Sequence, residues 1–301
     1  MTTLTGFGLA TLALILFGLY MVPRKLTRLR DIPFSLTMCL GVVVTTLTAN
    51  LVRHGQLLGP AEAHLAWLGF ICGPIWYGGV LAYAISVTQM GLSIATPTKN
   101  TTAVLGTLIG LVYFAEWQET RPLPALAGSV LVVLCAVLLG RTGERNGQRS
   151  FVTPAGVVAA IAAAVLFAAY TIPFKLAQVG GLDTVSLVAY MGVGTLIGAV
   201  LCFAVVERRW AEWLRAGLLD HAYAALCGLL WVLAVMFMAE AIRRIGLAIT
   251  WPFTNLNTVV TVACGVLLFH EIDVHRFGRT IALGLLAGVV GVVLLGVARL
   301  G

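Results

Sequence analysis

The stretch GLSIATPTKNTTAVLGTLIGLVYFAEW, residues 91–117, decides how the rest of the chain is interpreted. It is long and apolar enough to cross a bilayer, which takes about 20 residues. Pro97 removes a backbone donor and clashes with the preceding turn, so we expect the helix to bend or open there. Counting about 1.5 Å per residue from Gly91 places Lys99 roughly 12 Å into the membrane. A cation at that depth is costly, which makes Lys99 a candidate functional residue.

A diverged copy of this stretch occurs at residues 246–272, GLAITWPFTNLNTVVTVACGVLLFHEI. At an offset of 155, residues 71–116 match their counterparts at 14 of 46 positions, and Pro252 corresponds to Pro97. Lys99 has Thr254 as its counterpart. The sequence therefore predicts a duplicated fold in which the buried lysine occurs in one copy alone.

Composition indicates a polytopic membrane protein. Hydrophobic residues make up 60% of the chain and charged residues 10%, which is far from the balance of a soluble globule. The net charge of +7 comes from short loops between apolar segments, so it is a topology signal and no sign of nucleic-acid binding. The six cysteines fall inside apolar segments without CxxC spacing, and we interpret them as reduced core residues, neither disulfides nor metal ligands.

The fold class expected is an all-α polytopic membrane protein with ten transmembrane helices arranged as two inverted five-helix repeats. The predicted spans are residues 4–22, 33–52, 65–87, 91–113, 123–140, 153–174, 184–206, 221–242, 246–268 and 278–298. A polar connector, residues 141–152, divides the first repeat (1–140) from the second (153–301). The first spans of the two halves also repeat, because FGLYMVPRK (17–25) matches FAAYTIPFK (167–175) at an offset of 150.

Five spans is an odd number, so a tandem copy must insert upside down, as in many transporters with a site at the midplane. Loops on one side of the predicted membrane hold 12 Lys and Arg, against 6 on the other side. The positive-inside rule then places both termini outside a cell inner (plasma) membrane. The N-terminal segment lacks a basic n-region and an A-x-A site, and it is expected to be the first span instead of a signal peptide.

Three motifs carry a resemblance to a known group of proteins. Two five-span halves, each with a fourth span that closes in glutamate, resemble the drug/metabolite transporter superfamily. Within it, the chain is similar to the L-rhamnose–proton symporters and the glucose/ribose uptake transporters in three places: Tyr-x-x-Pro-x-Lys at 20–25, Gly-x-x-Trp-x-x-Gly at 73–79, and Gly91, Pro97 and Glu116-Trp117 in the fourth span. The resemblance implies a secondary transporter with a central cavity lined mainly by spans 1, 3, 4, 6, 8 and 9.

The residues expected to bind substrate are those with polar or aromatic groups near the centre of these spans. They are Lys99, Asn100, Trp76, Trp231, Asn255, Asn257, Tyr20 and Tyr170. Indole rings stack on the apolar faces of sugars and on cations, although large rings also fill helix interfaces. The amides follow the helix-opening prolines and suit hydroxyl or carboxylate groups, and the tyrosines can donate into a cavity. Lys99 would either pair with an anionic substrate group or act as a proton switch, unless it reaches the membrane surface or is held by free carbonyls.

The remaining acidic residues are expected to have structural roles. Glu116 and Glu271 end spans 4 and 9 near opposite membrane interfaces, so we do not expect them to couple protons at the midplane. Glu240 lies just before Arg243 and Arg244, and we expect a local ion pair.

The function expected is secondary active transport of a small polar, sugar-like metabolite by proton symport with alternating access. An alternative is a carrier or exporter of an anionic metabolite (a sugar acid, a phosphorylated metabolite or an amino acid) that uses Lys99. A lipid flippase is a further alternative. No enzyme activity, cofactor or metal is expected, because no midplane cluster of His, Asp or Glu occurs, and no phosphate-binding loop for ATP is present. The expected partners are the substrate, protons and the lipid bilayer, with no nucleic acid, in a monomer or homodimer.

Overall fold

The computed structural model describes residues 2–90, 95, 98–141, 153–267 and 274–299, and within them the secondary structure is helical throughout, with no strand. The longer helices in chain order are α1 (Thr2–Leu19), α2 (Asp31–His54), α3 (Ala63–Met90), α6 (Pro122–Gly140), α7 (Pro154–Ala169), α9 (Thr184–Cys202), α11 (Leu218–Ile245) and α14 (Val274–Ala298). The shorter ones are α5 (Thr102–Leu108), α8 (Thr171–Val179), α10 (Trp210–Leu214), α12 (Leu247–Thr254) and α13 (Asn257–Leu267). The prediction of an all-helical chain is confirmed.

Eight helices of the described chain are long and apolar enough to cross a membrane. They correspond to the predicted spans 1–3, 5–8 and 10. The fourth predicted span is described as the short helix α5, a π-helical turn η2 (Ile109–Tyr113) and a few residues before them. The ninth consists of α12 and α13. The break between α12 and α13 divides span 9 into two short helices, and in span 4 the described residues 98–113 are too few to be counted as a continuous span.

Span 9 opens shortly after Pro252, as the sequence predicts. Pro252 lies inside α12, which ends at Thr254, and α13 begins at Asn257. Because proline lacks an N–H, the carbonyl of Ala248 loses its usual helical donor. The Thr107 hydroxyl, on α5, donates to that carbonyl at 3.2 Å. Pro97, the counterpart in span 4, lies outside the described residues.

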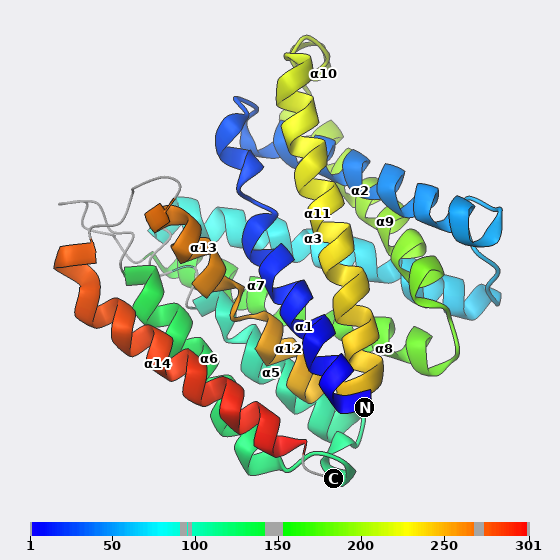
Figure 1. Cartoon of the computed structure of the whole chain (residues 1–301). Helices are drawn as coiled ribbons and strands as arrows, with labels where there is room; N and C mark the ends of the chain where they lie inside the picture. The colour runs from blue at the N-terminus through cyan, green and yellow to red at the C-terminus, as the bar shows by residue number, and fades with distance from the viewer. Residues whose placement is uncertain (1, 91–94, 96–97, 142–152, 268–273, 300–301) are drawn as a thin grey trace.

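The helices pack in two groups joined by the interrupted segments (Figure 1). One group contains α2, α3, α9 and α11, whose side chains form the larger hydrophobic core. The other pairs α6 with α14 along their lengths. Helix α1 packs against α11 and α7 against α3, while α5 and α12 cross between the groups. Helix α1 begins and α14 ends at the same end of the bundle (Figure 1).

Repeat-related glycines allow the closest helix contacts in the larger group. A Cβ on Gly73 would lie 2.2 Å from the Thr195 nitrogen of α9, and one on Gly228 would lie 2.3 Å from the Met38 oxygen of α2. A side chain is therefore excluded at both positions, which lie 155 residues apart. Gly73 opens the Gly-x-x-Trp-x-x-Gly motif, so this glycine has a packing role.

The outer surface is strongly apolar. Leu123 on α6 is 81% exposed, Val158 on α7 is 66% exposed, and many other large aliphatic side chains point outward from the long helices. A soluble monomer rarely exposes apolar area on this scale. Together with the eight long apolar helices, this surface makes the chain a multi-pass membrane protein.

Candidate functional site

A cavity of about 190 Å³ lies where α3 and α11 meet the interrupted segments of spans 4 and 9. Its described lining comes from the six segments that the resemblance implied: Phe17, Tyr20, Met21, Trp76, Val80, Tyr83, Lys99, Thr102, Phe167, Tyr170, Trp231, Met238, Trp251, Thr254, Asn255 and Asn257. Pockets for drug-sized ligands span about 300–1,000 Å³, so this cavity suits a smaller molecule.

The lining is largely made of residues that correspond in the sequence repeat. Twelve of the sixteen form six pairs at an offset of 150 or 155: Phe17 with Phe167, Tyr20 with Tyr170, Trp76 with Trp231, Tyr83 with Met238, Lys99 with Thr254, and Thr102 with Asn257. Equivalent residues of two copies meet around one space only where the copies face each other. The cavity therefore lies at the interface between the two halves of the chain.

Seven of the eight residues predicted to bind substrate line this cavity, and Asn100 does not. Asn100 is 2% exposed, and its Nδ2 atom has no hydrogen-bond partner among the described residues. Its repeat counterpart Asn255 is on the wall, where Nδ2 donates to the carbonyl of Trp251 at 2.8 Å. The two asparagines thus occupy different environments in the two copies. From the sequence we also expect the two helix-opening prolines to face one shared cavity, but Pro252 is buried and is not part of the described lining.

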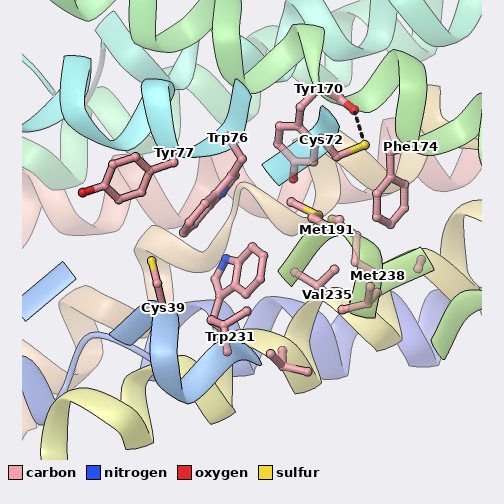
Figure 2. Close-up of a cluster of buried hydrophobic side chains, with 14 of the residues drawn as sticks. Cys39, Cys72, Trp76, Tyr77, Tyr170, Phe174, Met191, Trp231, Val235 and Met238 are labelled. Carbon is pink, nitrogen blue, oxygen red and sulfur yellow. Dashed lines mark hydrogen bonds between the residues drawn. The ribbon is translucent and has the colours of Figure 1, made fainter. Parts of the chain in front are cut away.

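Trp76 on α3 and Trp231 on α11 pack against each other within the larger hydrophobic core (Figure 2). Their ring centroids are 4.5 Å apart with a tilt of 44°, and both side chains are buried. Figure 2 shows Tyr170 nearby, on the same side of the pair as Cys72. The tryptophans form a rigid aromatic wall on which one face of a small ligand can rest.

Lys99 contributes to the lining from span 4. Its Nζ atom is 5.4 Å from the centroid of the Tyr83 ring and 5.7 Å from that of Phe167. Ring faces attract a cation through their quadrupole. No described residue that lines the cavity has a carboxylate, and Lys99 is the one Lys, Arg, Asp or Glu side chain in the described lining.

Trp251 is a lining residue that sequence reasoning missed. Its Nε1 donates to the Thr102 carbonyl at 3.0 Å, and its ring lies edge-on to Tyr170 with centroids 5.5 Å apart. Its counterpart in the sequence repeat is Thr96, so a search for identical residues in the two copies could not have found Trp251. By contrast, Phe17 and Phe167 are identical counterparts in the sequence repeat, and this identity could have indicated that both line the cavity.

A second polar cluster lies at the end of span 4, around Glu116. The carboxylate of Glu116 accepts hydrogen bonds from the backbone nitrogens of Leu247 and Ala248, both at 2.7 Å, and from Nζ of Lys175 on α8. Glu116 is 9% exposed and Lys175 is 12% exposed. The first two bonds cap the N-terminus of α12, where the backbone N–H groups would otherwise be unsatisfied. We call these contacts the Glu116 junction, and its geometry fits the structural role predicted for Glu116.

The other polar predictions have simple outcomes. Glu240 pairs with Arg244 at 2.8 Å, which confirms a local ion pair. All six cysteines are free thiols. Among the described residues no group of His, Cys, Asp or Glu could hold a metal ion. Glu271 lies outside the described residues.

Comparison with known proteins agrees with this arrangement. The family model described as "Sugar transport protein" matches residues 9–298. This match covers nearly the whole chain, and the chain therefore belongs to this sugar transport family. Its members are transporters, so the chain is a transporter and not an enzyme.

Individual relatives are similar over most of their length. A protein described as a "putative sugar uptake protein" from Streptococcus pyogenes serotype M1 is 26% identical over 274 residues, covering 88% of this chain and 89% of the relative. Another with this description, from Lactococcus lactis subsp. lactis, is 25% identical over 276 residues, covering 88% of each chain. One solved crystal structure has a TM-score of 0.73 at 18% identity, covering 99% of this chain and 97% of that one, which shows a shared fold.

Proposed function

We propose that this protein carries a small sugar-like metabolite across the membrane by alternating access, with the substrate bound in the cavity between the repeats. The observation that carries the proposal is the lining itself, because repeat-related pairs surround one space of monosaccharide rather than drug size. Tryptophan faces and amide and hydroxyl groups are the chemistry by which proteins hold sugars. The relatives described as sugar uptake proteins support the same substrate class.

We further propose ten membrane crossings in two inverted repeats, 1–140 and 153–301. The eight long helices supply eight crossings, and the interrupted segments α5–η2 and α12–α13 supply the fourth and ninth. Helix pairing supports a two-fold relation between the halves, and the odd number of spans in each half makes it an inversion. Exchanging the halves turns the pair α1 with α11 into α7 with α3, and the pair α2 with α11 into α9 with α3, and all four pairs are present. Discontinuous helices beside a central site are typical of inverted-repeat transporters.

Alternating access requires one end of the cavity to close while the other opens. The Glu116 junction ties span 4 of the first half to α8 and α12 of the second half. It is therefore a closure at that end, and opening there requires its bonds to break. In the sequence repeat, Glu271 and Lys25 correspond to Glu116 and Lys175. In an inverted repeat, Glu271 and Lys25 would form the equivalent closure at the opposite end of the cavity.

We also propose that transport is coupled to protons and that the chain belongs to the L-rhamnose–proton branch of the drug/metabolite transporters. Both proposals rest on the motifs in spans 1, 3 and 4. We also propose a location in the cell inner membrane with both termini outside. This proposal rests on the charge bias of the loops. The assembly is proposed to be a monomer or homodimer.

The test is uptake of radiolabelled monosaccharides by the purified full chain in liposomes, with and without an imposed pH gradient. We expect saturable uptake that the gradient accelerates. Trp76→Ala should abolish it, because it removes half of the aromatic wall. Trp67→Ala is the matched control on the same helix, since Trp67 is 59% exposed on the outer surface and should tolerate the change. Movement of labelled lipid without uptake of any sugar would replace this proposal by the flippase alternative.

A further inference from the structure

We propose that the cavity binds its sugar as an anion, with the substrate carboxylate held by Lys99, so that the preferred substrates are sugar acids. This inference rests on the proposed sugar transport and names the substrate class more narrowly.

The first step is the charge balance of the cavity. Of the 12 acidic residues in the chain, Glu144, Glu271 and Asp273 lie outside the described residues, and none of the other nine lines the cavity. Lys99 therefore has no carboxylate partner within the described lining. Its described neighbours are the rings of Tyr83 and Phe167, which attract the ammonium group but do not neutralise it.

The second step is energetic. A charged lysine within an apolar helix bundle is unfavourable unless a counter-ion accompanies it. The chain meets this requirement at Lys175, whose neighbour Glu116 provides the counter-ion. At Lys99 the described wall provides none, and the open space in front of the residue is the substrate cavity. A substrate with its own carboxylate supplies the missing charge, and a neutral sugar does not.

The third step separates carboxylate from phosphate. A phosphate monoester carries between one and two charges at neutral pH, and proteins hold it with arginine forks or several donors at once. The described lining contains one lysine and no arginine. The cavity volume of about 190 Å³ also leaves little space beyond a single sugar ring. A single carboxylate matches both the charge and the size.

The remaining lining can hold the rest of a sugar acid. Asn257 on α13 offers an amide to the sugar hydroxyl groups, and Thr254 at the end of α12, whose hydroxyl donates to the Trp251 carbonyl at 3.1 Å, offers its oxygen as an acceptor. The Trp76–Trp231 wall offers an apolar surface to the sugar ring. Thr254 is also the repeat counterpart of Lys99, so the two halves present a hydroxyl and an ammonium group at equivalent positions.

The experiment compares ligands that differ only in the carboxylate, namely glucose with glucuronate and galactose with galacturonate. Binding to the purified full-length protein is measured by titration calorimetry at pH 7.5. We expect at least one acid to bind at least tenfold more tightly than its neutral sugar. Lys99→Met should remove this preference, and Lys99→Arg should keep most of it because arginine remains charged.

A charge exchange is the second variant. Lys99→Thr combined with Thr254→Lys moves the ammonium group to the equivalent position of the other half, and we expect part of the acid preference to return relative to Lys99→Thr alone. Thermal unfolding of each variant shows whether it is folded, and Lys99→Arg keeps the test valid if Lys99→Met does not fold.

Three results would overturn the inference. If neutral sugars bind as well as their acids, sugar transport stands and the anionic substrate fails. If Lys99→Met keeps the acid preference, Lys99 is not the counter-ion. If Lys99→Met and Lys99→Arg both bind acids normally but lose pH-driven uptake, Lys99 is a proton switch instead. Absence of binding and uptake for every sugar and sugar acid would remove the proposed function as well.

Discussion

Two lysines within the apolar helices, Lys99 and Lys175, are both half-buried and lie in opposite environments. Lys175 contacts the Glu116 carboxylate, and its Nζ is 4.5 Å from the Phe114 ring centroid. Lys99 faces the cavity between two aromatic rings, without a carboxylate in the described lining. The same side chain therefore completes a structural junction in one place and remains available to a ligand in the other.

The difference shows how a charge in a membrane protein can be interpreted. A buried cation with an internal partner is part of the architecture, and its removal leaves the partner uncompensated. A buried cation without such a partner destabilises the resting protein. A lysine in such a place is therefore a candidate for a functional role. The distinction depends on the neighbour, not on the depth of the residue.

The largest expected effect separates the two lysines directly. Lys175→Met should lower the free energy of unfolding by about 3 kcal/mol, because it leaves the Glu116 carboxylate without its cation and held only by the two backbone N–H groups of α12. Lys99→Met should leave stability unchanged or raise it, since it removes a cation that has no carboxylate partner in the described lining. Thermal and denaturant unfolding in detergent measures both. Equal losses in the two variants would refute the comparison.

A double variant should recover much of the loss. Replacing both members of a buried pair by neutral groups is often close to neutral, so Glu116→Gln with Lys175→Met should regain about 2–3 kcal/mol relative to Lys175→Met alone. The glutamine oxygen can still accept one of the two N–H groups of α12. A double-mutant cycle gives the coupling energy, and additive losses would show that the two side chains do not interact.

Two glycines on one segment distinguish the junction from the cavity. A Cβ on Gly106 would lie 2.1 Å from Cδ1 of Trp251, on the cavity wall, and one on Gly110 would lie 2.5 Å from the Ala248 nitrogen and 2.8 Å from Glu116 Oε2, in the junction. Each alanine should cost about 1–3 kcal/mol through overpacking. Gly106→Ala should weaken substrate binding, whereas Gly110→Ala should mainly lower stability.

Gly8→Ala is the control for both glycine changes. Gly8 lies in a helix, and an added Cβ would meet nothing within 4 Å. Its unfolding and its binding should both remain as in the unchanged protein. Reduced binding in Gly110→Ala but not in Gly106→Ala would reverse the assignment of the two regions.

The smallest effect is expected for an ion pair outside the membrane-spanning segments. Asp183 precedes α9, accepts a hydrogen bond from Ser186 N at 3.0 Å, and lies 2.9 Å from His54 Nε2. Burial raises the pKa of Asp183, but the hydrogen bonds from His54 and Ser186 outweigh it and hold the pKa below its usual value. The stabilisation is therefore present above pH about 4 and disappears as the pH falls through the lowered pKa.

Asp183→Asn keeps an N-capping side chain and removes the charge, so we expect a loss of a few tenths of a kcal/mol at pH 7. Unfolding measured from pH 7 down to pH 3 should show the difference from the unchanged protein shrinking with acidification. A difference that grows at low pH would contradict the assignment. The contrast with Lys175→Met would then measure how much burial strengthens an ion pair in this protein.

The sequence alone determined the class of protein, the helical segments, the duplication and seven of the sixteen described lining residues. These features depend on local properties: span length, proline positions, and matches at fixed offsets such as Trp76 with Trp231. The short motifs in spans 1, 3 and 4 also indicated a sugar transporter, because they depend only on residue identity and spacing along the chain.

Only the tertiary structure decided which face of each span meets the cavity. Lipid is as apolar as the protein interior, so the hydrophobic pattern of a spanning helix does not distinguish its outer face from its inner face. For this reason the sequence could not exclude Asn100 from the wall, place Trp251 on it, or predict that Glu116 would reach across to cap α12. The contrast between Lys99 and Lys175 has the same origin, because a side chain's partner comes from a distant helix and is set by packing.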